Sequence, residues 1–209
     1  MQLIGMLDSP YVRRVAVALL TAGVRFEHKP ISLFRHIPAY STLSPLLKAP
    51  TLIAEDGGAI VESSVILEYL ATISPALAAL RPRTAPAFRV LGVALTVMEK
   101  AVQFHYERAL RGPGEQSESW RARVRGQLRV GLAELEGDAP ELWIEQSLGH
   151  VDIAVICAWG FLVGTLGDAI ELSEYPKLRN FAARGETLTA FQAAPQVDGA
   201  KIQSETRLA

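Results

Sequence analysis

The sequence predicts an α/β domain at the N-terminus followed by an all-helical domain. Every segment with strand character lies before residue 63, whereas only helical patterns follow residue 84. The first part reads as βαβ, then a helix, then ββα. Few soluble chains of this length place all their strands in the first third, so this order restricts the fold class more than it restricts the function.

The first half of the α/β domain is predicted as strand, helix and strand. Residues 2–6 are short, apolar and followed by a turn, as in a buried strand. From Pro10 onward apolar residues recur at helical spacing, with Arg13 and Arg14 on the other side of the helix. These two arginines are therefore expected to pair on the surface or at a subunit interface. Residues 24–32 alternate apolar and polar, as a half-buried strand does.

The second half of the domain is predicted as a weak helix, a hairpin and a helix. A loop and weak helix cover about 35–47. Within residues 49–63 two strand-like runs are joined by "EDGG", which indicates an antiparallel hairpin and completes a mixed four-stranded sheet. A helix is predicted over 63–73. Its apolar stripe is expected to contain Val65, Ile66, Tyr69, Leu70 and Ile73.

A proline-rich stretch after residue 73 marks a domain linker, which we place at 78–86 between domains 1–77 and 87–209. The second domain is predicted as a helical bundle, with helices over about 84–111, 116–136, 150–166 and 175–190. The most apolar helix, 150–166, carries Asp152 and is broken by glycines, so we expect it to be buried in the protein and not to span a membrane.

Composition favours a soluble globular protein without nucleic acid as a partner. The chain has 209 residues, of which 49% are hydrophobic and 21% charged, and its net charge is −1. No basic run interleaved with aromatic residues occurs, so neither nucleic acid nor a membrane is expected as a partner. The start, "MQLIGMLDSP", does not read as a signal peptide.

The cysteine and histidine residues point away from disulfide and metal chemistry. Cys157 is the only cysteine, so no intramolecular disulfide can form, and its apolar surroundings predict an inert core thiol. A reducing cytoplasm fits this usage best. His28, His36 and His150 lack the spacing of a metal site, so no metal is expected.

Ser9 stands directly before Pro10 at the predicted start of the first helix. The amides at a helix N-terminus stabilise an anion such as a thiolate, and a serine there can donate its hydroxyl to a bound sulfur. The alternative is an ordinary N-cap, in which the side chain bonds the backbone of its own helix. Ser9 alone does not decide between the two.

Two further positions allow similar alternatives. A cis bond between Ala49 and Pro50 would leave the backbone of Ala49 available to a bound peptide, whereas a trans proline would only end a loop. Glu62 and Ser63 at the start of the next helix either hold the ammonium and carboxylate of an amino acid or cap that helix.

The motifs "SPYVRRV", "KAPTL" and "ESSVILEYL", in this order within such a domain, resemble the glutathione S-transferase family. The resemblance extends from Met1 to about Pro195, and the serine before proline and an aromatic residue is similar to the plant tau pattern and its bacterial relatives. It implies a thioredoxin-like N-terminal domain that binds glutathione as co-substrate, an all-α C-terminal domain, and a homodimer.

The resemblance also assigns roles to single residues. Ser9 corresponds to the catalytic residue that contacts the glutathione sulfur, and Glu62 with Ser63 corresponds to the γ-glutamyl site. The glutathione-binding set that the resemblance implies is Ser9, Lys48, Ala49, Pro50, Glu62 and Ser63. The family more often has valine or isoleucine at the position of Ala49, which matters little because the backbone makes the bonds.

A second substrate is expected in an apolar pocket between the domains. The residues assigned to it are Met6, Leu7, Tyr11, Phe34, His105 and Tyr106. His105 and Tyr106 either polarise this substrate or only pack as partly buried aromatic residues. The helical domain also departs from the family: its capping box has Gly149 in the cap position, with Asp152 retained.

The function expected from these features is conjugation of glutathione to a small hydrophobic electrophile, as in detoxification. One alternative is a glutathione-binding or protein-interaction module with little turnover. The other is glutathione-dependent reduction of peroxides or disulfides, which is less favoured because a mixed disulfide requires a cysteine where Ser9 stands.

Overall fold

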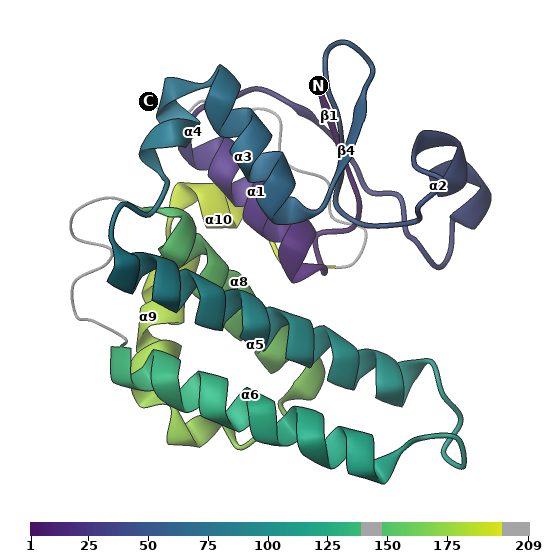
Figure 1. The fold of residues 1–209 in the computed structure, drawn as a ribbon, viewed down its shortest axis with the longest axis vertical. Helices are drawn as coiled ribbons and strands as arrows, with labels where there is room; N and C mark the ends of the chain where they lie inside the picture. Colours follow the sequence, from purple (N-terminus) through teal and green to yellow (C-terminus); the bar gives the residue numbers. More distant parts are fainter. Residues whose placement is uncertain (139–147, 198–209) are drawn as a thin grey trace.

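The computed structural model describes residues 1–138 and 148–197 and shows an α/β domain packed on a helical domain (Figure 1). The α/β domain contains β1 (Gln2–Ile4), α1 (Pro10–Thr21), β2 (Glu27–Lys29), α2 (Ile37–Leu43), β3 (Thr51–Ile53), β4 (Ala59–Val61), α3 (Ser63–Ile73) and α4 (Pro75–Ala79). The remaining described elements are α5 (Ala85–Ala109), α6 (Glu118–Asp138), α8 (His150–Leu166), η1 (Leu172–Glu174), α9 (Pro176–Glu186) and α10 (Thr189–Ala193).

The sheet is mixed and four-stranded, as predicted, with the order β2-β1-β3-β4. β1 pairs with β2 in parallel, and β3 pairs antiparallel with both β1 and β4, which confirms the hairpin. The strands are shorter than the sequence predicts. β1 ends at Ile4 because Gly5 adopts a φ of 134°, and a Cβ there would lie 2.6 Å from Cγ2 of Val12.

α1 joins the two domains. It packs against β1 and α3 on one side and against α8 and α10 on the other. This double contact buries both arginines of the helix, which corrects the expectation that they lie on the surface: Arg13 is 1% exposed and Arg14 is 2% exposed. Their guanidinium groups need internal partners, because an unpaired buried charge is costly.

α3 also buries a different face from the one predicted. Ile66 and Leu70 are buried as expected, but Leu67 takes part in the core, whereas Val65 and Ile73 are more than half exposed. The difference arises because α3 packs against α1 and α4 as well as the sheet, which shifts the buried stripe by about one residue.

The helical domain is built around α8, which is buried along nearly its whole length as predicted. α5 packs against both α6 and α8, and α9 crosses α8 closely: a Cβ at Gly185 would lie 2.3 Å from Ile156. α8 begins at the expected cap, where the Gly149 amide donates to Oδ2 of Asp152 over 2.8 Å. Figure 1 shows α5 and α6 running side by side beneath the α/β domain.

The connection between the domains is shorter than the predicted linker. α4 occupies residues 75–79 of the proline-rich stretch, and α5 begins at Ala85. Proline at the first turn of each helix explains this, because its fixed φ suits a helix start. None of the described helices is long and apolar enough to cross a membrane.

Candidate functional site

Ser9 is the N-cap of α1. Its Oγ accepts a hydrogen bond from the Val12 amide over a long 3.4 Å, and its carbonyl accepts the first helical bond from Arg13. A serine hydroxyl has one hydrogen to donate besides its acceptor positions. The cap bond therefore leaves that hydrogen available to a ligand, so capping and ligand binding are compatible at Ser9.

The loop before β3 presents backbone to the same region. The Ala49–Pro50 peptide bond is cis. The Lys48 carbonyl accepts hydrogen bonds from the Tyr40 hydroxyl (2.9 Å) and from Oγ1 of Thr51 (2.8 Å). Since Tyr40 and Thr51 are fully buried, these bonds hold Lys48 and Ala49 against the core.

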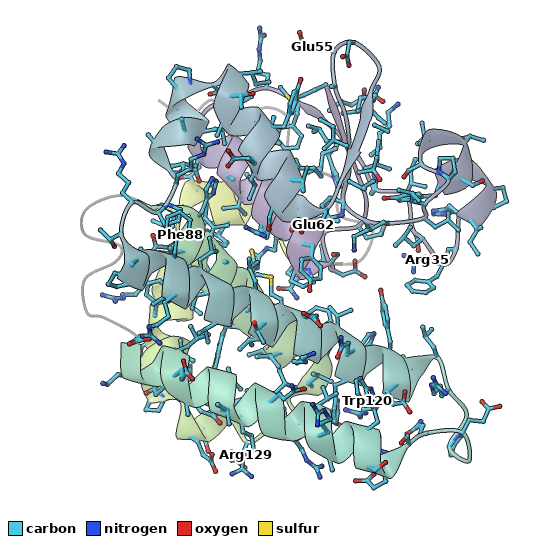
Figure 2. The ribbon with its side chains drawn as sticks, in the orientation of Figure 1. Arg35, Glu55, Glu62, Phe88, Trp120 and Arg129 are labelled. Atoms are coloured by element: carbon cyan, nitrogen blue, oxygen red, sulfur yellow. The ribbon has the colours of Figure 1, made fainter. Side chains whose placement is uncertain are left out.

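Glu62 begins α3 in a strained conformation. Its φ is +72°, which is uncommon for a residue other than glycine and points to a functional constraint. Its carboxylate accepts from the amides of Ser64 (3.1 Å) and Val65 (3.2 Å) and from the hydroxyl of Ser63 (3.2 Å). Figure 2 shows Glu62 at the lower end of α3, on the side of the α/β domain that faces α5.

Behind this helix start lies the buried guanidinium of Arg14. Its Nη1 donates to Oγ of Ser63 over 3.0 Å and to Oγ of Ser64 over 3.1 Å. Arg13, its neighbour, makes a different set of contacts: it forms a two-pronged ion pair with Glu186 (2.6 Å for each bond) and donates to the Ala194 carbonyl (2.9 Å).

A cavity of about 660 Å³ opens between the α/β domain and α5 and α8. Eight of the predicted site residues line it: Met6, Ser9, Tyr11, Phe34, Lys48, Ala49, His105 and Tyr106. Its other lining residues are Asp8, Pro10, Ile31, Ser32, Leu33, Ile37, Leu47, Val102 and Phe161. The walls are thus mainly apolar, with a few polar groups beside Ser9, as in sites for small organic ligands.

Burial and nearby charges keep the phenol groups of Tyr11 and Tyr106 and the imidazole of His105 uncharged in this cavity. Burial, assisted by the carboxylate of Glu99, raises the pKa of Tyr11 to about 12. Burial also raises the pKa of Tyr106. The pKa of His105 is lowered by burial and by the positive charge of Arg108, and the Asp8 carboxylate offsets only part of this decrease. At neutral pH both phenols are therefore hydrogen-bond donors, and the imidazole is uncharged.

Four of the predicted site residues, Leu7, Pro50, Glu62 and Ser63, do not line this cavity. Leu7 lies within the turn after β1 and is fully buried in the hydrophobic core, not in the lining of the cavity, so its assignment to the pocket is corrected. Pro50 is buried, while Glu62 and Ser63 lie at the start of α3 beyond the cavity lining. Sequence reasoning missed Asp8 and Phe161 in the cavity, although Asp8 directly precedes Ser9 and could have been found from that position.

A second hollow of about 830 Å³ lies on the helical domain, between α8, α9 and α10. Arg13, already engaged by Glu186, is the one residue singled out from the sequence that lines it. Cys157 is fully buried nearby, and burial raises the pKa of its thiol to about 12. Within the described ranges no three histidine, cysteine or acidic side chains gather as metal ligands would.

Comparisons with known proteins agree with this geometry. Residues 3–78 match the family model for the glutathione S-transferase N-terminal domain. The uncharacterized GST-like protein YibF of Escherichia coli K12 is 29% identical over 166 residues, which cover 78% of this chain and 82% of that protein.

Solved structures extend the agreement to both domains. A glutathione S-transferase from Methylobacillus flagellatus KT with glutathione bound superposes with a TM-score of 0.83 at 26% identity, covering 94% of this chain and 99% of that one. A glutathione transferase family member from Pseudomonas fluorescens Pf-5, also with bound glutathione, gives 0.79 at 27% identity, with 94% and 98% covered. The family-model match thus assigns residues 3–78 to a glutathione S-transferase N-terminal domain, and the superpositions show that the whole described fold is similar to that of two-domain glutathione S-transferases.

Proposed function

We propose that this protein is a glutathione transferase, which activates the thiol of glutathione and conjugates it to a small hydrophobic electrophile. The observation that carries the proposal is the position of Ser9, whose hydroxyl borders an apolar cavity of about 660 Å³ at the N-terminus of α1. Two similar structures hold glutathione, which supports the same ligand here. We further propose that the protein acts in the cytoplasm.

In this proposal the thiolate lies at the start of α1. The Ser9 hydroxyl donates to the sulfur while its oxygen still accepts from the Val12 amide. Lowering the thiol pKa by about 2 units requires about 2.7 kcal/mol of preferential binding of the thiolate. One hydrogen bond to an anion together with the partial positive charge of a helix N-terminus supplies this amount.

The rest of glutathione follows the polar groups around the cavity. The backbone of Ala49, held outward by the cis bond to Pro50, pairs with the cysteinyl part, and Lys48 binds the glycine carboxylate. Glu62 and Ser63 hold the γ-glutamyl ammonium and carboxylate at the start of α3.

The electrophile occupies the apolar part of the cavity, against Met6, Tyr11 and Phe34. With an aryl halide, the sulfur attacks the ring carbon, a carbon–sulfur bond forms, and the halide leaves with the electrons of the broken bond. His105 and Tyr106 face this region, and the protonated phenol donates a hydrogen bond to polar substituents of the substrate.

Glutathione-dependent disulfide reduction is the weaker alternative. A mechanism through a mixed disulfide between glutathione and the protein needs an accessible thiolate in the protein. The only cysteine, Cys157, is fully buried, and its pKa is raised to about 12. A binding module without turnover would keep the same site and is separated from the enzyme only by an activity measurement.

The decisive experiment compares Ser9→Ala with Ser74→Ala. Ser74 caps α4 through a bond of the same length as that of Ser9, 3.4 Å to the amide three residues on, so each variant loses an equivalent cap worth about 1 kcal/mol. Only Ser9→Ala should reduce turnover with aryl halides, by about 10- to 100-fold, and raise the pKa of the bound thiol by about 1 to 2 units. Equal rates in the two variants would refute the role of Ser9.

A second experiment addresses glutathione itself. Replacing both Glu62 and Ser63 by alanine should weaken retention on a glutathione resin by about tenfold or more, because an ammonium and a carboxylate each lose a partner. Retention equal to that of the unmodified protein would exclude this pair from the binding site. A panel of aryl halides, epoxides, peroxides and disulfides then distinguishes conjugation from reduction and from binding alone.

We also propose a homodimer. Val65 and Ile73 of α3 and Phe88 of α5 are each more than half exposed, and a subunit interface over these helices would bury them. Light scattering should give twice the chain mass for the native protein, and Phe88→Asp should shift it toward the monomer. A native protein of single-chain mass would refute the dimer.

A further inference from the structure

The second hollow, on the helical domain, is separate from the cavity proposed for glutathione and its electrophile. It has a volume of about 830 Å³ and lies between α8, α9 and α10. Cavities of this size hold small organic ligands. No described residue lines both spaces: α8 contributes Phe161 to the cavity, and Trp159 and Gly164 to the hollow. A ligand in the hollow therefore does not compete with glutathione for the same side chains.

Apolar side chains form much of the wall of the hollow. The lining includes the rings of Trp159 and Phe191 and the aliphatic side chains of Val163 and Leu172. Val163 is 53% exposed, although α8 is buried along nearly its whole length. A ligand that covers these side chains removes apolar surface from water, which favours its binding.

Two glycines of α8 make room on one side of the hollow. A Cβ at Gly160 would lie 2.4 Å from Oε1 of Gln196, so a larger residue there would displace that side chain. At Gly164 the nearest atom to such a Cβ is Nε2 of Gln196, at an ordinary contact distance of 3.8 Å. The space beside Gly164 is therefore open, and a side chain at this position would extend into the hollow.

A buried ion pair also borders the hollow. The guanidinium of Arg13 is 1% exposed, holds both oxygens of Glu186, and donates to Oε1 of Gln196 over a longer 3.3 Å. It also lies 5.2 Å from the centroid of the Phe191 ring. Arg13 and Glu186 balance each other, so this pair gives the hollow no net charge.

Arg179 of α9 supplies the charge that is not balanced. It is exposed, lines the hollow, and forms no ion pair with an acidic side chain in the part of the chain that the structure describes. The charged lining residues are thus two arginines and one glutamate, which leave one positive charge in excess. A ligand with a single negative charge complements this lining.

We propose that the hollow binds an amphipathic aromatic anion. A flat ring system packs against Trp159, Val163 and Leu172, and the single negative charge of the ligand pairs with Arg179. The apolar walls provide most of the affinity, and the arginine favours anions over uncharged molecules of the same shape. This site goes beyond the proposed transferase function and does not depend on it.

Two fluorescent probes with the same rings test the role of charge. The first, 8-anilinonaphthalene-1-sulfonate, carries one negative charge, and the second, N-phenyl-1-naphthylamine, lacks the sulfonate. Both are titrated with the full chain in saturating S-hexylglutathione, which is expected to fill the other cavity. Arg179→Gln should weaken the sulfonate by about three- to fivefold and change the uncharged probe by less than about 1.5-fold. Equal changes for the two probes would overturn the proposal.

Arg184→Gln is the matched control for charge, because Arg184 is exposed on the same helix but does not line the hollow. It removes the same net charge from the protein and should change neither probe by more than about 1.5-fold. A loss of sulfonate binding as large as that of Arg179→Gln would mean that only the overall charge matters, and the proposal would fail.

Gly164→Leu tests the place of binding by filling the hollow. It should weaken both probes by about tenfold or more. Gly126→Leu is its control, since Gly126 lies on α6 and a Cβ there has no atom within 4 Å. Leucine favours helix more than glycine does, so both variants should fold. Equal probe binding in the two variants would overturn the proposal.

The outcomes keep this inference apart from the proposed function. If calorimetry shows no binding of S-hexylglutathione, the proposed function fails, whereas a loss of probe binding in Gly164→Leu alone still supports the hollow. If S-hexylglutathione displaces the sulfonate completely from the unmodified protein, the probe lies in the cavity at Ser9, and the inference about the hollow is refuted.

Discussion

Replacing His150 by leucine tests how the interface between the two domains responds to pH. His150 begins α8, is 5% exposed, and neither ring nitrogen has a hydrogen-bond partner. Burial and the nearby charges of Arg14 and Arg81 lower its pKa to about 4 from an ordinary value of 6.5. The folded protein therefore resists protonation of this ring, whereas the unfolded chain accepts it.

The magnitude follows from the size of this shift. Above pH 6.5 the ring is neutral in both states, so it adds no pH dependence. As the pH falls from 6.5 to about 4, the unfolded chain takes up a proton that the folded protein does not, and stability is lost. A shift of this size corresponds to a loss of about 3 kcal/mol when the fall is complete.

Urea unfolding at pH 7, 5.5 and 4.5 measures this loss for the unmodified protein and for His150→Leu. Leucine does not titrate, so the stability of the variant relative to the unmodified protein should rise by about 2 to 3 kcal/mol between pH 7 and pH 4.5. Asp152, whose pKa burial raises to about 6, titrates in both proteins and cancels in the comparison.

His150→Gln provides a control, because it also cannot titrate but keeps a polar side chain. It should follow the same pH course as His150→Leu, at a different absolute stability. Parallel curves for the unmodified protein and both variants would refute the reasoning, since they would mean that the His150 ring is protonated as easily in the folded as in the unfolded state.

Three further predictions concern stability. Arg13→Ala should cost about 3 kcal/mol in urea unfolding, because it leaves the Glu186 carboxylate without its partner; Arg13→Lys should cost less, and equal costs would argue against the two-pronged pair. Tyr40→Phe should cost about 1 kcal/mol and weaken glutathione binding, because the Lys48 carbonyl loses one of two donors; unchanged affinity would show that this bond does not position the loop. Gly5→Ala should lower stability by about 3 kcal/mol, since its Cβ would meet Val12 at a φ of 134°; a protein of native Tm would contradict that geometry.

The order and type of the elements could be predicted from the sequence because they depend on local patterns. The "EDGG" turn predicts the hairpin of β3 and β4, and the apolar periodicity from Pro10 predicts α1. Strand lengths could not be predicted in this way. β1 ends at Ile4, where Gly5 adopts a φ of 134°, and the close approach of Val12 from α1 leaves no room there for a Cβ.

The candidate site was predicted where motifs lie at the ends of elements. Ser9 and Ala49 could be placed because proline marks the start of a helix and the start of a strand, and both residues line the same cavity. Leu7 was misassigned because its neighbours Met6 and Asp8 line the cavity while it points into the core, and a loop has no side-chain period from which to infer this.

The two arginines of α1 mark the division between what sequence and tertiary structure determine. Sequence by itself determines that α1 is a helix, that Ser9 stands directly before it, and that Arg13 and Arg14 lie opposite its most apolar stripe. Only the packing of α8, α10 and α3 around the helix decides that this opposite side is also buried. The periodicity of a sequence shows how one helix distributes its polar groups, whereas the burial of those groups depends on every element that packs against the helix. Because α8, α10 and α3 surround α1, Arg14 is not the expected surface charge but a buried cation that contacts Ser63.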